Sequence, residues 1–352
     1  MSRSTRRPVF VSVALAAALA LAGCGSGQSS SPERAGEQGV HGSTDQDGSN
    51  GAGTTAEADG QVPSVEAVEP QLPVTFTGDG GVEIEVTSLD RVLVLDDATM
   101  EIMQALGHAD LIGITPDTSL IEDVAAQAEE RITTAGRGSL TVEGVVALEP
   151  TLVIGTSMRR HAEVIAGLQA AGIPATLIDS SQEAPDKIRK TAELLGVPES
   201  GEQLAAQVQE QFNQAETTLA GIQERPRVMI LSSSGAGDSG DTTAAGEETP
   251  AHQVIVGAGG LNTGAESGLD RYQSITAEGL VAAAPEVIVV AASEIDDLGG
   301  EEGIWEQVDG LSGTPAAATG SLVVMDDMQL KGGAVSAGLG ILALQAQLHP
   351  GA

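Results

Sequence analysis

The sequence is poor in aromatic residues and lacks the compact motifs that mark common enzymes. Its 352 residues include one Trp, one Tyr and three Phe. Sites that hold a ligand between several stacked rings are therefore excluded. The motifs H-E-x-x-H, G-x-S-x-G and C-x-x-C do not occur in the sequence, so zinc peptidases, serine hydrolases and dithiol redox proteins are not indicated. We expect a protein that is not an enzyme.

Positive charge is also scarce. The sequence has 16 Lys and Arg against 50 Asp and Glu, which gives a formal net charge of -34. Binding to a phosphate backbone requires clustered Lys and Arg, so nucleic acid is excluded as a partner. The charge fits a soluble extracytoplasmic domain.

Histidines are few and scattered. The five lie at positions 41, 108, 161, 252 and 349, with no pair at the i, i+4 spacing. A zinc or manganese site with three or four protein ligands is therefore not expected.

The only cysteine closes an N-terminal export signal. Three arginines precede an apolar run, residues 9–21, which is too short to span a bilayer comfortably, and the run ends in Leu-Ala-Gly-Cys24. This is a bacterial lipobox. We predict that residues 1–23 are removed as a signal peptide and that Cys24 is lipidated. The exported protein would then be anchored to the outer face of the cytoplasmic membrane.

Residues 24–72 form a distinct low-complexity segment. They are rich in Gly, Ser, Glu, Asp and Gln and have scarcely any large apolar side chain. Such a segment cannot bury enough surface to offset the entropy of ordering. We predict a disordered acidic tether between the anchor and the folded part.

A sixteen-residue pattern occurs twice beyond the tether. LTVEGVVALEPTLVIG begins at Leu140 and ITAEGLVAAAPEVIVV begins at Ile275, an offset of 135 residues without a gap. Six positions are identical, among them the pair Glu143 and Glu278. An offset of domain size argues against a solenoid and favours two related α/β lobes with a ligand between them.

Hydrophobic patterns in the rest of the chain alternate between strand and helix type. An opening hairpin is predicted over 73–86, and strand–helix–strand units follow it. Residues 199–223 carry apolar side chains at helical spacing, which corresponds to a helix of roughly 35 Å at about 1.5 Å per residue. The predicted fold class is α/β, with two Rossmann-like lobes of parallel sheet joined by a single long connecting helix. The predicted ranges are 73–198 for the N-terminal lobe, 199–225 for the connector and 226–352 for the C-terminal lobe.

Two short motifs are weak matches to known sites. Residues 254–262 read Val-Ile-Val-Gly-Ala-Gly-Gly-Leu-Asn, an apolar strand that runs into glycines as in a dinucleotide fingerprint. The sixth position is Asn262, however, and the acid that follows, Glu278, belongs to a helix start. Residues 237–240 resemble a serine-protease nucleophile loop without its setting. Neither motif predicts a cofactor or an active site.

Two residues are candidate iron ligands. His161 follows the strand of the first repeat, where a loop would open toward a cleft, although an exposed histidine at a helix start is the simpler alternative. Tyr272 is the only tyrosine and precedes the helix of the second repeat, where it would otherwise pack at the lobe interface. A phenolate suits Fe(III), and the adjacent Arg271 would favour the ionised form. A His and a Tyr from opposite lobes would form an axial pair for haem iron.

The order and spacing of several degenerate motifs resemble one family. They are Arg91-Val-Leu-Val-Leu, Thr99-Met-Glu, Ala105-Leu-Gly, the ExxxALxP pattern from Glu143, and Gly259-Gly-Leu-Asn. In this order they are similar to the cobalamin, siderophore and haem binding proteins of ABC importers. The resemblance covers nearly everything from residue 73 onward. It implies two α/β lobes joined by one long helix, with little opening and closing.

Within that family the chain is similar to the haemin receptor lipoproteins of actinobacteria. The resemblance implies that His161 and Tyr272 are the axial ligands of haem b, the transported ligand. Residues that would support the haem are Arg271, Arg159, Arg160 and Met328.

In the same family an acidic residue of each lobe docks on basic residues of the permease. The matching positions are Glu143 and Glu278. A structural alternative exists for either one alone, because Glu in a helix first turn gains roughly 0.3–1 kcal/mol from the helix dipole. The implied partners are the permease with its ATPase, the haem, and the membrane through the lipid anchor. We expect a monomer.

Two other functions stay open from the sequence. The first is a receptor for a ferric siderophore or cobalamin, toward which basic residues at positions 137, 159, 160, 271 and 331 would converge. The second is an adhesion or scaffold module whose lobes bind protein and have no cleft for a small ligand.

Overall fold

The computed structural model describes residues 54–56, 60–78, 80–134, 139–156, 161–233 and 242–351. All of them belong to the compact unit Ser49–Ala352. The predicted signal peptide, the lipidation site Cys24 and the first part of the predicted tether lie outside the described residues.

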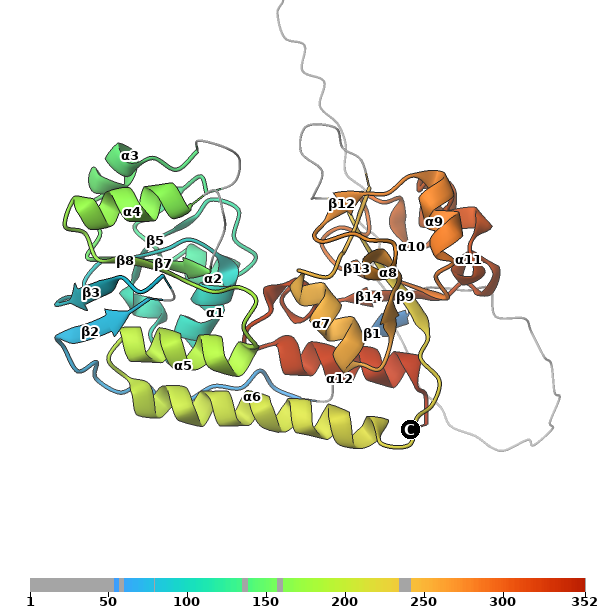
Figure 1. Ribbon diagram of the computed structural model, residues 1–352, viewed down its shortest axis with the longest axis horizontal. Coiled ribbons are helices and arrows are strands. Elements are labelled where there is room, and N and C mark those ends of the chain that lie inside the picture. The colour runs from blue at the N-terminus through green and yellow to red at the C-terminus, as the bar shows by residue number, and fades with distance from the viewer. Residues whose placement is uncertain are drawn as a thin grey trace, which may run out of the picture. The chain divides into compact units, whose positions relative to one another are not determined.

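The N-terminal lobe is built on a five-stranded parallel sheet (Figure 1). Its order is β6-β5-β4-β7-β8, with strands β4 (Val92–Val94), β5 (Ile112–Pro116), β6 (Glu130–Ile132), β7 (Leu152–Thr156) and β8 (Ala175–Ile178). Successive residues of β4 face opposite sides, since Val92 and Val94 belong to one hydrophobic core and Leu93 to another. The strand is apolar throughout because helices cover both faces of the sheet.

Helices and one hairpin complete this lobe. They are α1 (Asp97–Ala105), η1 (Ala109–Leu111), α2 (Glu122–Ala125), α3 (Val142–Val146), α4 (Ala162–Ala170) and α5 (Ala184–Leu194), with the antiparallel hairpin β2 (Val74–Thr77) and β3 (Glu83–Val86). The N-cap of α1 is Asp96, whose side chain accepts the N–H of Thr99, a common way to satisfy a free donor of the first turn.

A single helix, α6 (Pro198–Leu219), connects the two lobes and belongs to both cores. It lies against α5 of the N-terminal lobe and α12 (Ala337–Leu348) of the C-terminal lobe (Figure 1). Leu204 and Val208 pack in the N-terminal core and Ala215 in the C-terminal one. The connector predicted over 199–225 is therefore helical up to Leu219, and the chain then turns at Gly221, which has a φ of +102°.

The C-terminal lobe contains a seven-stranded mixed sheet. Its order is β1-β14-β13-β9-β10-β12, with β11 also paired to β9. The strands are β1 (Thr54–Ala56), β9 (Arg227–Ser232), β10 (Thr243–Ala244), β11 (Leu261–Asn262), β12 (Gln273–Ser274), β13 (Val287–Ala291) and β14 (Leu322–Met325). The neighbours β9, β13 and β14 are parallel, as predicted, whereas β10 pairs antiparallel with β9 and β12.

Helices also cover this second sheet. They are α7 (Pro250–Gly257), α8 (Thr263–Glu266), α9 (Ala277–Ala283), α10 (Gly300–Gln307), η3 (Leu311–Gly313), α11 (Pro315–Thr319), a π-helical turn η4 (Met328–Gly332), and α12. Together with the first lobe they form the predicted α/β fold of two lobes and one connecting helix.

The two copies of the sequence repeat have the same local structure. Thr141 caps α3 by accepting the N–H of Gly144, and Thr276 caps α9 by accepting the N–H of Gly279, both at 3.1 Å. A buried parallel strand follows each helix, β7 in the first lobe and β13 in the second. The repeat is therefore a helix–strand unit that occurs once in each lobe.

An equivalent residue in the turn between each repeated helix and its strand also has an unusual backbone conformation. Glu149 and Ala284 have φ values of +50° and +44°, and among the described residues they are the non-glycine positions with positive φ. Both precede a proline, which ends the helix and starts the chain toward the next strand. L-residues adopt this left-handed region at a cost, so the duplication has preserved a strained turn.

The segment before the first lobe corrects the predicted extent of the tether. Thr54–Ala56 forms β1 and pairs parallel with the edge strand β14. Further along, Val65 packs against the N-terminal core and its N–H donates to Ala105 O at 2.9 Å. The predicted tether, residues 24–72, therefore includes residues that are ordered. Although residues 60–72 are polar in composition, a few apolar side chains and backbone hydrogen bonds attach them to the lobes.

The second correction concerns residues 254–256, which the sequence suggests as a strand. They lie in α7, whose N-cap Thr249 accepts the N–H of His252 and which begins at Pro250. A short apolar run has the same appearance in a buried helix as in a strand. No helix among the described residues is both long and apolar enough to cross a membrane.

Candidate functional site

His161 is buried at the carboxyl edge of the first sheet. It lies directly before α4, in the connection that follows β7, and only 2% of its surface is exposed. Its Nε2 lies 3.3 Å from the carbonyl oxygen of Thr134, in the loop after β6. The alternative of an exposed histidine at a helix start is therefore wrong. The neighbouring Arg159 and Arg160 lie outside the described residues.

Tyr272 lies before β12 and packs its ring against the C-terminal core. Its hydroxyl oxygen is buried and has no hydrogen-bond partner among the described residues. Burial, and then the charge of Glu294, raise the pKa of Tyr272 above its ordinary value of 10. A buried phenol without a partner is a group that a ligand would satisfy.

A buried group of three polar residues adjoins the tyrosine through Lys331. Lys331 Nζ lies 5.9 Å from the centre of the Tyr272 ring and 2.5 Å from Glu294 Oε2. Ser232 Oγ donates to Glu294 Oε1 at 2.8 Å. Glu294 is 4% exposed, so Lys331 supplies the charge that makes its burial tolerable.

These residues come from three neighbouring strands of the second sheet. Ser232 ends β9, Glu294 follows β13, and Lys331 lies in η4, which follows β14. The carboxyl ends of parallel strands meet at one edge of a sheet, where ligands of α/β proteins commonly bind. Sequence reasoning named Lys331 only for a siderophore and missed Glu294 and Ser232, although a polar residue just after a buried strand is a usable signal.

Arg271, predicted to support the haem, forms an ion pair at the surface. Its Nε lies 3.0 Å from Glu248 Oε2, and both side chains are more than half exposed. Burial and Glu294 raise the pKa of the adjacent Tyr272, and the support of a haem by Arg271 stays a prediction. Lys331 is the cation that lies over the Tyr272 ring.

The remaining predicted support, Met328, is half-buried in η4. It packs against the N-terminal core, although η4 follows the last strand of the C-terminal lobe. Met328 therefore lies where the two lobes meet.

The two glutamates of the repeat are both exposed. Glu143 lies in the first turn of α3 and Glu278 in the first turn of α9. Neither side chain has a hydrogen bond or ion pair within the described residues. Both carboxylates are thus available to a partner.

A buried carboxylate joins the lobes next to this region. Glu101, in α1, accepts hydrogen bonds from the N–H groups of Val335 and Ser336 at 2.8 and 3.1 Å, and from the Ser336 hydroxyl. Burial, followed by a weaker effect of Asp326, raises the pKa of Glu101 to about 7, although the three hydrogen bonds oppose this shift. Nothing in the residue pattern predicts this contact, whose partners are 235 residues apart.

A buried lysine faces the same carboxylate. Lys187, in α5, is 2% exposed, and burial lowers its pKa, while the charges of Asp96, Glu101 and Asp179 oppose the shift. The junction of the lobes thus contains charged groups of both signs at low exposure.

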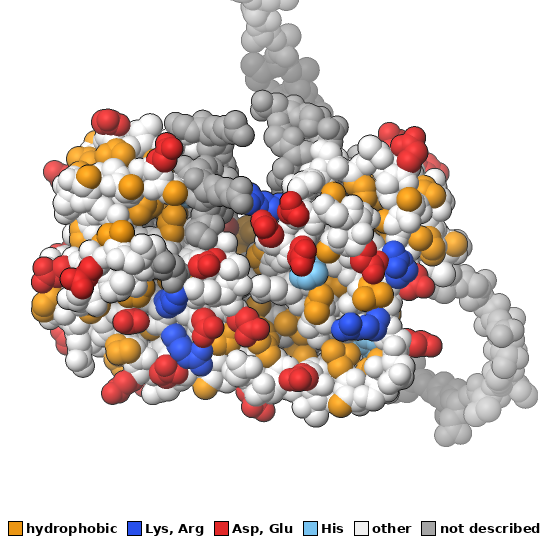
Figure 2. Space-filling view, in the orientation of Figure 1, with side chains coloured by type: hydrophobic (Ala, Val, Ile, Leu, Met, Phe, Trp, Pro, Cys, Tyr) orange, Lys and Arg blue, Asp and Glu red, His pale blue; other side chains and the backbone are white. Residues whose placement is uncertain are grey.

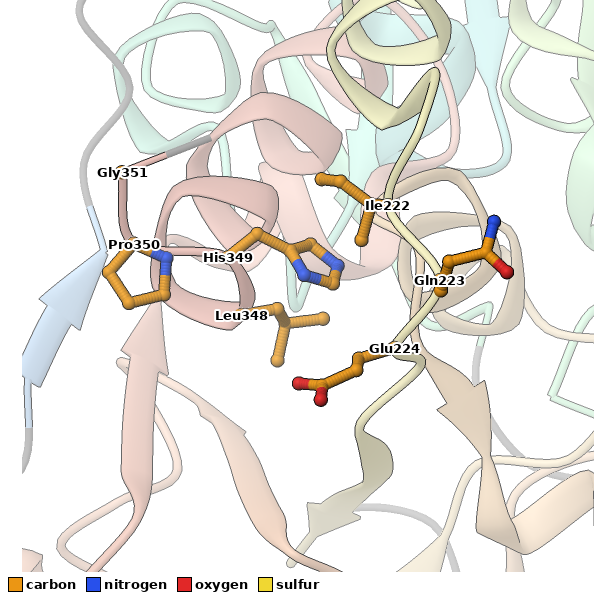
Figure 3. Close-up of a pocket in the computed structure, with 7 residues that line it drawn as sticks. All are labelled: Ile222, Gln223, Glu224, Leu348, His349, Pro350 and Gly351. Atoms are coloured by element: carbon orange, nitrogen blue, oxygen red, sulfur yellow. The ribbon is translucent and has the colours of Figure 1, made fainter.

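Two open concavities are present on the surface of the described residues, and neither involves the candidate ligands. One has a volume of about 330 Å³ and is lined by Ile222, Gln223, Glu224, Leu348, His349, Pro350 and Gly351, between the end of α12 and the segment after α6 (Figure 3). The other, of about 390 Å³, is lined by Ala277, Glu278, Val281, Ala282 and Gly310. His161 and the buried group of Ser232, Glu294 and Lys331 follow strands of the two sheets. We therefore place the candidate site at the carboxyl edges of the sheets and not in these concavities.

The residues able to bind a metal restrict the site to certain metal-containing ligands. No group of three or more His, Cys, Asp or Glu residues in the described part of the chain is arranged to hold a bare metal ion. His161 and Tyr272, in different lobes, offer one nitrogen and one oxygen donor. Such a pair suits an iron whose other positions are already occupied by its own ligand.

Comparison with known proteins identifies the family. Residues 92–328, more than half of the chain, match the periplasmic binding protein family, and the chain belongs to this family. No curated protein matches at a significant level. The family consists of binding proteins, which confirms the expectation that the chain is not an enzyme and the expectation that it acts outside the cytoplasm.

Several solved structures are similar over most of their length. The periplasmic heme-binding protein RhuT from Roseiflexus sp. RS-1, in its apo form, is 29% identical with a TM-score of 0.64, over 74% of this chain and 97% of RhuT. The heme-binding protein HmuT is 26% identical with a TM-score of 0.71, over 85% of this chain and 97% of HmuT. Variants of HmuT with a tyrosine, a histidine or an arginine replaced by alanine have the same TM-score. The heme-binding protein BhuT, in complex with two hemes, is 26% identical with a TM-score of 0.63, over 73% of this chain and 97% of BhuT.

Proposed function

We propose that this protein is a haem receptor that delivers haem to an ABC importer. The observation that carries the proposal is the buried Tyr272 hydroxyl, which has no partner among the described residues and belongs to a ring that lies beside Lys331. Its counterpart, His161, is buried at the carboxyl edge of the first sheet. The proposal is supported by similarity to RhuT and HmuT over 97% of each of those chains.

The roles of the residues follow from their chemistry. His161 donates the imidazole lone pair and Tyr272 the phenolate oxygen to the two axial positions of haem iron, which is cargo and undergoes no reaction. Lys331 pairs with Glu294 and so reduces the repulsion that this buried carboxylate would exert on a phenolate at Tyr272. The sequence has no C-x-x-C-H motif for covalent attachment, so we propose haem b.

Absorption spectroscopy with hemin tests the proposal directly. Purified protein mixed with hemin is expected to show a shifted Soret band. His161→Ala and Tyr272→Phe should each change this band, and the double variant should abolish it. His252→Ala is the matched control, because His252 is a half-buried histidine of α7 that contacts Asn262. An unshifted Soret band with the wild-type protein, or an unchanged band with the double variant, would overturn the proposal.

A ferric siderophore or cobalamin is the competing ligand for the same fold. Any ligand that binds only the folded state raises the melting temperature, and at equal concentration the tighter ligand raises it more. We expect hemin to stabilise the protein more than either competitor at equal concentration. A larger shift with a ferric siderophore would assign the protein to that ligand instead.

We further propose that the protein is a lipoprotein attached through Cys24. The lipobox around this residue and the export signal before it support the proposal. Wild-type protein should fractionate with membranes, whereas Cys24→Ala should appear in the soluble fraction or the medium. Equal membrane association of both forms would exclude the lipid anchor.

Docking to the permease is proposed for Glu143 and Glu278. Their exposure and their equivalent positions in the two repeats support this role. Charge reversal of both residues to Arg should abolish haem uptake by cells while hemin binding to the purified protein is unchanged. Loss of hemin binding would show that these residues have a structural role instead.

A further inference from the structure

Glu101, in α1 of the N-terminal lobe, lies at the start of α12 of the C-terminal lobe (Figure 1). Its carboxylate accepts the N–H groups of Val335 and Ser336 at 2.8 and 3.1 Å. Ser336 is the N-cap of α12, but its side chain makes no capping hydrogen bond to the helix and donates to Glu101 instead. A carboxylate at a helix N-terminus also interacts favourably with the helix dipole. Glu101 therefore fixes the beginning of α12 from across the lobe junction.

Helix α12 packs directly on η4, the π-helical turn that precedes it. Gly340 of α12 lies so close to the carbonyl oxygen of Gln329 in η4 that a Cβ at this glycine would overlap with the oxygen. The N–H of Gln329 donates to Asp326 Oδ1 at 3.0 Å, which holds η4 to the end of β14. Turns of the π-helical type are rare and often occur at functional sites. A shift at the start of α12 would therefore move η4 as well.

The turn η4 contributes one side chain to each lobe. Met328 packs against the N-terminal core. Lys331 belongs to the ligand site of the other lobe, because its Nζ lies 2.5 Å from Glu294 Oε2 and 5.9 Å from the centre of the Tyr272 ring. The position of Lys331 thus depends on how η4 is held between the lobes.

The position of Lys331 matters because cations are few in this protein. The sequence has 16 Lys and Arg against 50 Asp and Glu. On the face shown in Figure 2, acidic side chains are spread over both lobes, whereas Lys and Arg appear in small separate patches. Burial, and then the charge of Glu294, raise the pKa of Tyr272, and the ion pair of Lys331 with Glu294 reduces the second effect. Displacement of Lys331 from Glu294 would make a phenolate at Tyr272 harder to form.

We propose that Glu101 is a positioning residue for the ligand site of the opposite lobe: by holding the start of α12 it keeps η4, and with it Lys331, in place beside Tyr272. The inference rests on the proposed function and extends it, because haem binding then depends on a contact between the lobes as well as on the two axial ligands. Loss of this contact affects the Tyr272 site in addition to the stability of the protein.

Hemin affinity tests the inference, measured by titrating purified protein and following the Soret band. Glu101→Leu removes both acceptor oxygens and keeps much of the side-chain volume. It should weaken hemin binding by about tenfold, which is within the range usual for coupled sites. Ile102→Val is the matched control, because Ile102 is the next residue of α1 and is buried in the N-terminal core. It should lower the melting temperature and leave the hemin affinity unchanged. Wild-type affinity of Glu101→Leu would overturn the inference.

A double-mutant cycle with Lys331→Met tests whether Glu101 acts through Lys331. If it does, Lys331→Met should weaken hemin binding several-fold less in the Glu101→Leu background than in the wild type. Effects that multiply, as for independent sites, would show that Glu101 has a structural role only. If Glu101→Leu does not fold, Glu101→Gln replaces it in both experiments. The amide keeps one acceptor oxygen, so this variant should weaken binding by a few-fold, and an unchanged affinity would then reject the inference.

The same cycle without ligand separates this inference from the haem-receptor proposal. An unshifted Soret band with the wild-type protein would reject the haem receptor, and the midpoint of urea unfolding would then decide the role of Glu101. Lys331→Met should lower this midpoint less in the Glu101→Leu background, because the pair with Glu294 is already displaced there. An equal lowering in both backgrounds would reject the positioning role.

Discussion

Glu101 and Ser336 join the two lobes through a buried carboxylate. Glu101 belongs to α1 of the N-terminal lobe, and Ser336 immediately precedes α12 of the C-terminal lobe. The backbone N–H and the hydroxyl of Ser336 both donate to Glu101 Oε1, and the N–H of Val335 donates to Oε2. The bonds fix the start of α12 against α1, so the protonation of one side chain affects the lobe junction.

The stability of the protein should therefore depend on the ionisation of Glu101. Its pKa is about 7 in the folded state against 4.5 for the free side chain, so the folded state binds a proton more tightly than the unfolded state. The contribution of Glu101 to stability is highest below pH 4.5 and is lost as the pH rises toward 7 and above. At about 1.4 kcal/mol per pKa unit, the loss amounts to about 3 kcal/mol.

Comparison with Glu101→Gln isolates this contribution, because glutamine has the shape of the protonated acid and does not titrate. We expect the unfolding free energy of the wild type, relative to the variant, to be lower at pH 8 than at pH 5. Urea unfolding at both pH values measures the difference. A difference that is the same at both pH values would contradict the raised pKa.

The strained turns after the repeated helices should yield a stabilised variant. Ala284 has a φ of +44°, a conformation that costs an L-residue roughly 1–2 kcal/mol relative to glycine. Ala284→Gly should raise the unfolding free energy by about 0.5–1 kcal/mol, since the greater chain entropy of glycine offsets part of the gain. Thermal unfolding measures the change.

Ala282→Gly provides the matched control two residues earlier. Ala282 lies within α9, where glycine lowers stability by about 0.5–1 kcal/mol. The two substitutions remove the same methyl group and should have opposite signs. Destabilisation by both would show that the left-handed turn at Ala284 is not strained.

The segment before the first lobe should contribute to stability through Val65. This residue packs against the N-terminal core and its N–H donates to Ala105 O. Val65→Asp would place a charge at a partly buried position and should cost about 1–3 kcal/mol. Val68→Asp is the control, because Val68 is 49% exposed, and it should change the unfolding free energy by less than about 0.5 kcal/mol. Equal effects of both would show that residues 60–72 do not stabilise the lobe.

The local elements of the fold could be predicted because their signals lie close together in sequence. Thr141 and Thr276 mark helix starts, Pro150 and Pro285 mark helix ends, and buried strands follow both. The connecting helix was likewise evident from its spacing of apolar residues. The prediction of a strand at residues 254–256 was wrong. A short apolar run does not distinguish a strand from a buried helix, and the N-cap Thr249 starts a helix here.

The candidate site was predictable only in part, because only some of its residues lie beside a local sequence signal. His161 and Tyr272 could be named because each lies beside a copy of the repeat. The buried group around Lys331, Glu294 and Ser232 could not be assembled, because its members follow three different strands and Lys331 is 99 residues from Ser232. Residues so far apart in sequence are brought together only by the order of the strands in the parallel sheet. The sequence predicts the parallel strands but not their order.

The pair of Lys331 and Glu294 should be the ion pair on which the second lobe depends most. Their side chains are 18% and 6% exposed, and Nζ lies 2.5 Å from Oε2. Lys331→Met leaves a buried carboxylate without its cation, which typically costs about 3–5 kcal/mol. Arg271→Met removes an exposed pair with Glu248 and should cost less than about 1 kcal/mol.

The double variant Lys331→Met with Glu294→Gln should recover most of the loss, since the neutral amide oxygen still accepts a hydrogen bond from the Ser232 hydroxyl. Urea unfolding of the four proteins measures these differences, and equal stabilities of Lys331→Met and Arg271→Met would show that solvent screens the buried pair as fully as the exposed one.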